Sequence, residues 1–116
     1  MNIITLVLAL LAAGPERMEW KVGEETREAL VCAPSGESDD PPPLVFAWHG
    51  HGGSMRNSAK TFRIHEEWPE AVVVYPQGLA TAGKTDPEGK KPGWQHGAGE
   101  EGDRDLLFFD AMLETM

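Results

Sequence analysis

The chain has little cysteine and little positive charge: Cys32 is alone among 116 residues, and 10 Lys and Arg stand against 19 Asp and Glu. A single cysteine excludes an intramolecular disulfide framework and any zinc site built from several cysteines. The formal net charge is −9. Proteins that bind nucleic acid need a basic surface to release counterions from phosphates, and helices that lie on anionic lipid are basic as well. The composition therefore argues against both classes.

Hydrophobic residues make up 41% of the sequence and charged residues 25%, which is ordinary for a folded globular chain. The length favours one domain. Residues 1–13 carry no charged side chain, and Ile3–Ala13 has the length of a signal-peptide core but is short for a membrane span. No basic residue precedes it, so a buried N-terminal helix is the alternative. We expect a signal peptide over 1–13, a secreted or periplasmic protein, and a folded part over 14–116.

The patterns of the folded part predict an α/β protein. A hairpin is followed by a parallel strand–helix–strand unit, because two short apolar runs flank a helical stretch. A long Gly/Pro-rich loop then leads to a last helix. The expected elements are strands at 17–22, 26–33, 44–48 and 71–75, helices at 55–67 and 103–116, and loops at 34–43 and 76–102.

Several details follow from these elements. Phe62 and Ile64 are expected to face the core, and Asp103 is expected to cap the last helix. The apolar stripe of that helix is expected to comprise Leu106, Phe109, Leu113 and Met116. No parallel strand follows this helix, so we expect an incomplete sheet with an exposed edge beside 71–75, poor solubility of the isolated chain, and a chain that forms the N-terminal portion of a larger protein.

The most informative motif is His49-Gly50-His51-Gly52-Gly53-Ser54, directly after an apolar strand. Glycines let the backbone approach a ligand closely and adopt positive φ. In open α/β sheets, ligands bind at the carboxyl ends of the strands. Freed N–H groups in such a loop are suited to hold a negative oxygen. A turn without function is the alternative.

With this motif in place, the chain resembles the secreted α/β-hydrolase esterases of the polyhydroxybutyrate depolymerase and feruloyl esterase type. The resemblance runs from about Glu19 to the last residue and rests on LVFAWHGHGGS, an F-x-x-H helix, WPEAVVVYPQG, PGWQ and DRDLLFFDAML. It implies a partial α/β-hydrolase fold and a serine esterase acting on a polyester or a plant-wall ester, without a cofactor. It also implies that the backbone N–H of His51 belongs to the oxyanion hole, with Gly50, Gly52 and Gly53 shaping the loop, and that Trp94 lies near the substrate.

The sequence departs from this family at the nucleophile. The family carries it in a G-x-S-x-G elbow, and none of the four serines stands in that pattern; Ser54 comes nearest but lacks the second glycine. We expect the nucleophile and the rest of the triad beyond Met116, so that this chain alone does not hydrolyse esters. A G-x-S-x-G pattern in the downstream reading frame would support this. A secreted binding module without catalysis is the alternative.

Other motifs are weaker. Gly78–Thr85 matches the phosphate-binding pattern G-x-x-x-x-G-K-[ST], but the prolines and glycines that follow oppose the helix that a nucleotide site needs, which makes nucleotide binding a remote alternative. His49, His51, His65, Glu66 and His96 are too dispersed to predict a metal site. Cys32 is expected to be a buried structural residue, Glu100–Asp105 a solvated helix start, and Trp48 and Trp68 packing residues.

Overall fold

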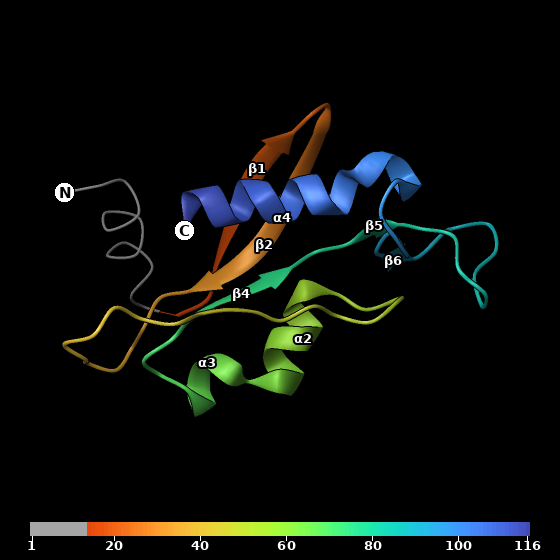
Figure 1. The fold of residues 1–116 in the computed structure, drawn as a ribbon. Helices are drawn as coiled ribbons and strands as arrows, with labels where there is room; N and C mark the ends of the chain where they lie inside the picture. Colours follow the sequence, from red (N-terminus) through yellow and green to blue (C-terminus); the bar gives the residue numbers. More distant parts are fainter. Residues whose placement is uncertain (1–13) are drawn as a thin grey trace.

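A four-stranded mixed sheet with helices on both faces forms the centre of the computed structural model, which describes residues 14–116 (Figure 1). The signal peptide expected over 1–13 lies outside the described residues. The strand order is β1-β2-β4-β3, and a second, two-stranded sheet pairs β5 with β6. The strands are β1 (Glu16–Val22), β2 (Glu25–Cys32), β3 (Leu44–Phe46), β4 (Val72–Pro76), β5 (Leu79–Ala80) and β6 (Pro92–Gly93). The helices are α2 (Met55–Phe62), α3 (Ile64–Glu67), the 3-10 helix η1 (Glu100–Asp103) and α4 (Arg104–Thr115).

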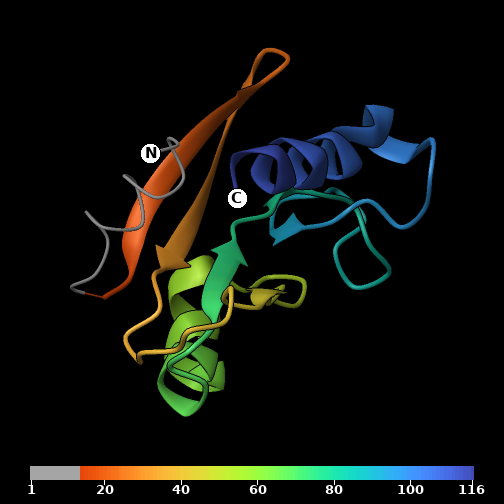
Figure 2. The same cartoon turned by 60° about the vertical axis from the view of Figure 1, so that its left-hand side comes forward.

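The expected hairpin is confirmed as β1 and β2, which pair antiparallel over their whole length. Gly23 turns the chain with φ of 61°. Only residues 29–32 of β2 also pair with β4. The tip of the hairpin therefore extends beyond the rest of the sheet, past α4 (Figure 2).

β4 is the central strand, antiparallel to β2 and parallel to β3. The parallel strand–helix–strand unit is therefore confirmed. Successive side chains of β4 point to opposite faces, so Val72 and Val74 pack beneath α4, whereas Val73 and Tyr75 pack against α2. Every residue of β4 is buried, as its apolar composition predicts for a strand covered on both faces.

The predicted position of the exposed edge is wrong. The strand at 71–75 has a neighbour on each side, and the two edges of the described sheet are β1 and β3. The three residues of β3 are only half-buried. The apolar run over 44–48 had indicated a central strand, but the pairing of β2 with β4 leaves β3 outermost. Strand order is fixed by contacts between distant segments, which a local pattern does not contain.

The helix expected over 55–67 is two helices. Arg63 adopts a left-handed conformation, with φ of 53°, and separates α2 from α3. Phe62, expected in the core, is 46% exposed. Ile64 does pack against the apolar cluster beneath α2, as expected.

The last helix also differs from the prediction. Asp103 makes no side-chain cap; its carboxylate accepts hydrogen bonds from the Gly99 N–H (2.6 Å) and the Gln95 amide (3.1 Å). Of the expected stripe, Leu106 and Leu113 are exposed and Phe109 is half-buried. Met116 alone of the four packs against the main core cluster.

The buried face of α4 carries Asp105, Phe108 and Met112 instead. Asp105 forms an ion pair with the buried Arg27 of β2, and this contact explains why a polar residue lies on the buried face of α4. The loop expected over 76–102 contains the β5–β6 hairpin, so it is not wholly irregular. Within residues 14–116, no helix has the length and apolar character needed to cross a membrane.

Candidate functional site: the glycine loop and an aromatic slot

The glycine loop, residues 49–54, connects the end of β3 to α2, and its first residue anchors it. His49 is buried, and its Nε2 accepts a hydrogen bond from the Gly78 N–H (2.9 Å). Nδ1 must then carry the proton of a neutral ring, which it donates to the Gly50 carbonyl (2.6 Å). The His49 carbonyl accepts from the Trp94 indole (2.8 Å). His49 is therefore a structural residue that ties the loop to the end of β4 and to the loop before α4.

Two of the three glycines meet a geometric demand. Gly52 has φ of 84°, a conformation that side chains disfavour. At Gly53 a Cβ would come within 3.0 Å of the Gly50 carbonyl oxygen, because the chain turns back there with a Gly53 N–H bond to that oxygen. Gly50 is different: its φ is not positive, and a Cβ there would meet no atom within 4 Å. The loop geometry predicted from the motif thus applies to Gly52 and Gly53 but not to Gly50.

The backbone N–H groups of the loop fall into two sets. The Gly52 N–H donates to the Pro92 carbonyl (2.7 Å) and the Gly53 N–H to Gly50, as described above. Within residues 14–116, the N–H of His51 has no hydrogen-bond acceptor, and neither have those of His49, Gly50 and Ser54. A backbone donor without an acceptor, at the carboxyl end of a parallel strand, is the kind of group that can bind an anionic oxygen.

The side chain of His51 is held by an aspartate that the sequence did not single out. His51 Nε2 lies 2.9 Å from Asp86 Oδ2. The N–H groups of Lys90 (3.1 Å) and Lys91 (2.9 Å) also donate to the Asp86 carboxylate. The bond from His51 and these two backbone donors lower the pKa of Asp86 from 3.8 to about 2. The loop is thereby pinned to the segment between β5 and β6.

An aromatic slot of about 390 Å³ lies beside the loop. Its walls are two indoles, Trp48 and Trp94, whose ring centroids are 4.8 Å apart at an angle of 90°. Leu106 and Phe109 of α4 complete the apolar lining. Trp94 was singled out from the sequence, whereas Trp48 had been expected to be a packing residue. The sequence signal for Trp48 was its position immediately before His49.

Polar groups form the floor of the slot. Gln95 and Asp105 line it, and each is bound to the other: the Gln95 N–H donates to Asp105 Oδ2 (2.6 Å), and the Asp105 N–H donates to Gln95 Oε1 (2.9 Å). Asp105 also accepts from Arg27 Nη2 (2.9 Å). These interactions fix α4 relative to Trp94 and give the slot a rigid base.

Two serine hydroxyls and the cysteine thiol have structural roles in the part of the chain that the structure describes. Ser54 Oγ caps α2 by accepting from the Asn57 N–H (3.1 Å), and the buried Ser58 Oγ donates to the Met55 carbonyl (3.0 Å). Cys32 is buried, and burial raises the pKa of its thiol from 9.0 to about 12. The thiol is therefore protonated at neutral pH and a poor nucleophile.

The remaining weak motifs are also placed. After β5, a tight turn held by reciprocal backbone bonds between Gly83 and Asp86 (3.0 and 3.1 Å) carries Lys84. No helix begins there, so the phosphate-binding geometry implied by Gly78–Thr85 is not formed. Residues 14–116 contain no group of three His, Cys, Asp or Glu side chains arranged to hold a metal ion.

No protein-family model matches the chain, and no curated protein matches it either. The candidate site is therefore defined by its own geometry: a backbone donor at the end of a parallel strand, next to an apolar slot.

Proposed function

We propose that this chain supplies the oxyanion loop and part of the acyl- or aryl-binding surface of a secreted serine esterase with the α/β-hydrolase fold, of the polyhydroxybutyrate depolymerase or feruloyl esterase type. The proposal rests on the motifs described above and on the arrangement of the loop. In this assignment the His51 N–H binds the carbonyl oxygen of an ester, and the slot lined by the two indoles and by Leu106 and Phe109 holds its apolar group.

The observation that carries the proposal is the free His51 N–H within a loop that is anchored on both sides. His49 and Asp86 hold the two sides of the loop, and Gly52 and Gly53 donate elsewhere. A donor that is fixed in advance stabilises a developing oxyanion without reorganisation, and one such bond is worth about 3–4 kcal/mol in the transition state.

The proposal includes an expected lack of turnover. Ser54 and Ser58 are bound within α2, and no hydrogen bond joins a serine to a histidine in the described part of the chain. We therefore expect the 116-residue chain to leave p-nitrophenyl butyrate intact. Turnover that a serine-directed inhibitor abolishes would contradict this expectation.

Nuclear magnetic resonance of the ¹⁵N-labelled chain tests the loop and the slot separately. Methyl ferulate and ethyl 3-hydroxybutyrate should shift the indole N–H signal of Trp94, and butylphosphonate, a tetrahedral anion, should also shift the amide signal of His51. Trp48→Ala should weaken binding of the esters, whereas the exposed Trp68→Ala should not. If the phosphonate leaves His51 unchanged, the oxyanion assignment is wrong.

A non-catalytic binding module is the second candidate. It is favoured by the slot itself, because among residues 14–116 no activated nucleophile accompanies it. A binding module predicts that esters and their ether analogues bind equally and affect Trp94 only. An esterase loop predicts an additional response at His51.

A further inference from the structure

A second pocket, which shares no lining residue with the slot, is lined by several positively charged side chains although the protein is acidic overall. It is an open pocket of about 430 Å³ between α2, α3 and β2. Arg56, Lys60 and Arg63 line it, which is three of the chain's ten Lys and Arg residues. Its floor is apolar, because Leu30 and Ala59 are buried there.

The two cations of α2 have no counterion. Arg56 and Lys60 are four residues apart, so they lie on the same side of the helix and repel one another. The helix dipole favours Lys60, which is in the last turn, but disfavours Arg56, which is in the first turn without an acidic residue to compensate. Neither side chain forms an ion pair within residues 14–116. An anion in the pocket would offset both the mutual repulsion and the unfavourable position of Arg56.

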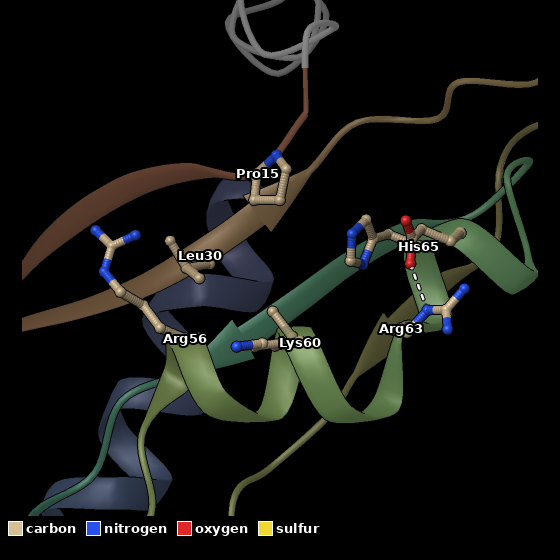
Figure 3. A pocket seen from close by; sticks show the side chains of 8 residues that line it. Pro15, Leu30, Arg56, Lys60, Arg63 and His65 are labelled. Atoms are coloured by element: carbon tan, nitrogen blue, oxygen red, sulfur yellow. Dashed lines mark hydrogen bonds and ion pairs between the residues drawn. The ribbon is translucent and has the colours of Figure 1, made fainter.

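Arg63 and Glu66, which also line the pocket, neutralise one another. Arg63 Nε donates to Glu66 Oε2 at 2.6 Å. Figure 3 shows the Arg63 guanidinium turned toward this partner, away from Lys60. The charge that remains for a ligand is therefore that of Arg56 and Lys60.

His65 also lines the pocket. The Tyr75 hydroxyl accepts from the His65 backbone N–H (3.3 Å), and it lies 2.8 Å from His65 Nδ1. These two contacts hold the imidazole in place. In Figure 3 the imidazole lies on the pocket side of its helix, between Pro15 and Lys60.

We propose that this pocket binds a small monocarboxylate with a short apolar body. The carboxylate pairs with Arg56 and Lys60, and the body covers Leu30 and Ala59. This inference does not depend on the proposed esterase function, since it uses another face of the sheet.

Sodium butyrate, titrated into the ¹⁵N-labelled full chain, tests the proposal, with 1-butanol as the neutral probe. Butyrate should shift the amide signals of Leu30, Ala59 and Lys60, with a dissociation constant on the order of millimolar. Butanol should bind at least about tenfold more weakly, since it lacks the charge-assisted bonds. Raising the salt concentration should weaken butyrate binding.

Charge-removing variants give the control. Arg56→Gln and Lys60→Gln should each weaken butyrate binding about five- to tenfold while the spectrum stays that of a folded protein. Lys21→Gln, at an exposed position of β1, should leave butyrate binding unchanged. Equal binding of butyrate and butanol, equal effects of Lys21→Gln and Arg56→Gln, or shifts confined to Trp94 would each overturn the proposal.

Discussion

The buried ion pair between Arg27 of β2 and Asp105 of α4 leads to a strong prediction for stability. Arg27 is 1% exposed, and its Nε has no acceptor. Among residues 14–116, Asp105 is the only carboxylate that forms an ion pair with Arg27, and Asp105→Ala removes it. The remaining bonds, to the carbonyls of Arg104 (3.3 Å) and Gln77 (3.4 Å), are long. The variant leaves a buried positive charge without a counterion.

Breaking a buried pair in this way costs about 3–5 kcal/mol. The whole folding free energy of a domain is about 5–15 kcal/mol, so the variant loses a large share of it. The burial of Arg27 also lowers the pKa of its guanidinium, an effect that the hydrogen bond to Asp105 partly offsets. Burial and the bond to Asp105 have the two largest effects on this pKa, and when Asp105 is removed only the unfavourable effect of burial remains.

Urea unfolding followed by tryptophan fluorescence measures the loss. With a slope of about 1.5 kcal/mol per molar urea, the midpoint should fall by about 2 M or more. The double variant Arg27→Met/Asp105→Leu should recover most of the stability, because an apolar pair of similar volume replaces a buried ion pair at little cost. A loss below about 1 kcal/mol for Asp105→Ala, or a double variant as unstable as the single one, would refute this reasoning.

Three further predictions concern the loop and the thiol. Gly52→Ala should destabilise the fold by about 1–2 kcal/mol because of its positive φ, whereas Gly50→Ala should change it by less than about 0.5 kcal/mol; equal losses in chemical denaturation would contradict the geometry of the loop. The low pKa of Asp86, about 2 in the fold against 3.8 ordinarily, means that its contribution to stability is present above about pH 4 and is lost as the pH falls through 2. Carboxyl ¹³C titration should show this pKa rising toward 3.8 in His51→Ala. Cys32 should resist a thiol reagent at pH 8 until the chain unfolds, and rapid labelling of the native protein would show that it is accessible.

Local sequence patterns correctly predicted those elements whose residues all have the same environment. The run of apolar residues in β4 requires cover on both faces, and both faces are covered. The same argument failed for β3, because a run of apolar residues does not state which strand is outermost. Arg63 ends α2 in a left-handed conformation without a glycine or proline to signal it.

Long-range polar contacts account for the other differences. The orientation of α4 depends on a bond between Arg27 and Asp105, which are 78 residues apart. At the candidate site, the glycine cluster after a strand predicted the loop, and the family resemblance indicated Trp94. Asp86, which holds His51 across 35 residues, carried no local signal.

The right-angled contact between the two indoles of the slot has an optical consequence. Trp48 precedes β4 in the sequence and Trp94 follows it, and their ring centroids are 4.8 Å apart. Electronic transitions of chromophores at this separation couple, and the coupling varies steeply with distance and angle. Near-ultraviolet circular dichroism of the unlabelled chain therefore reports whether the two indoles stay in contact when a guest enters the slot.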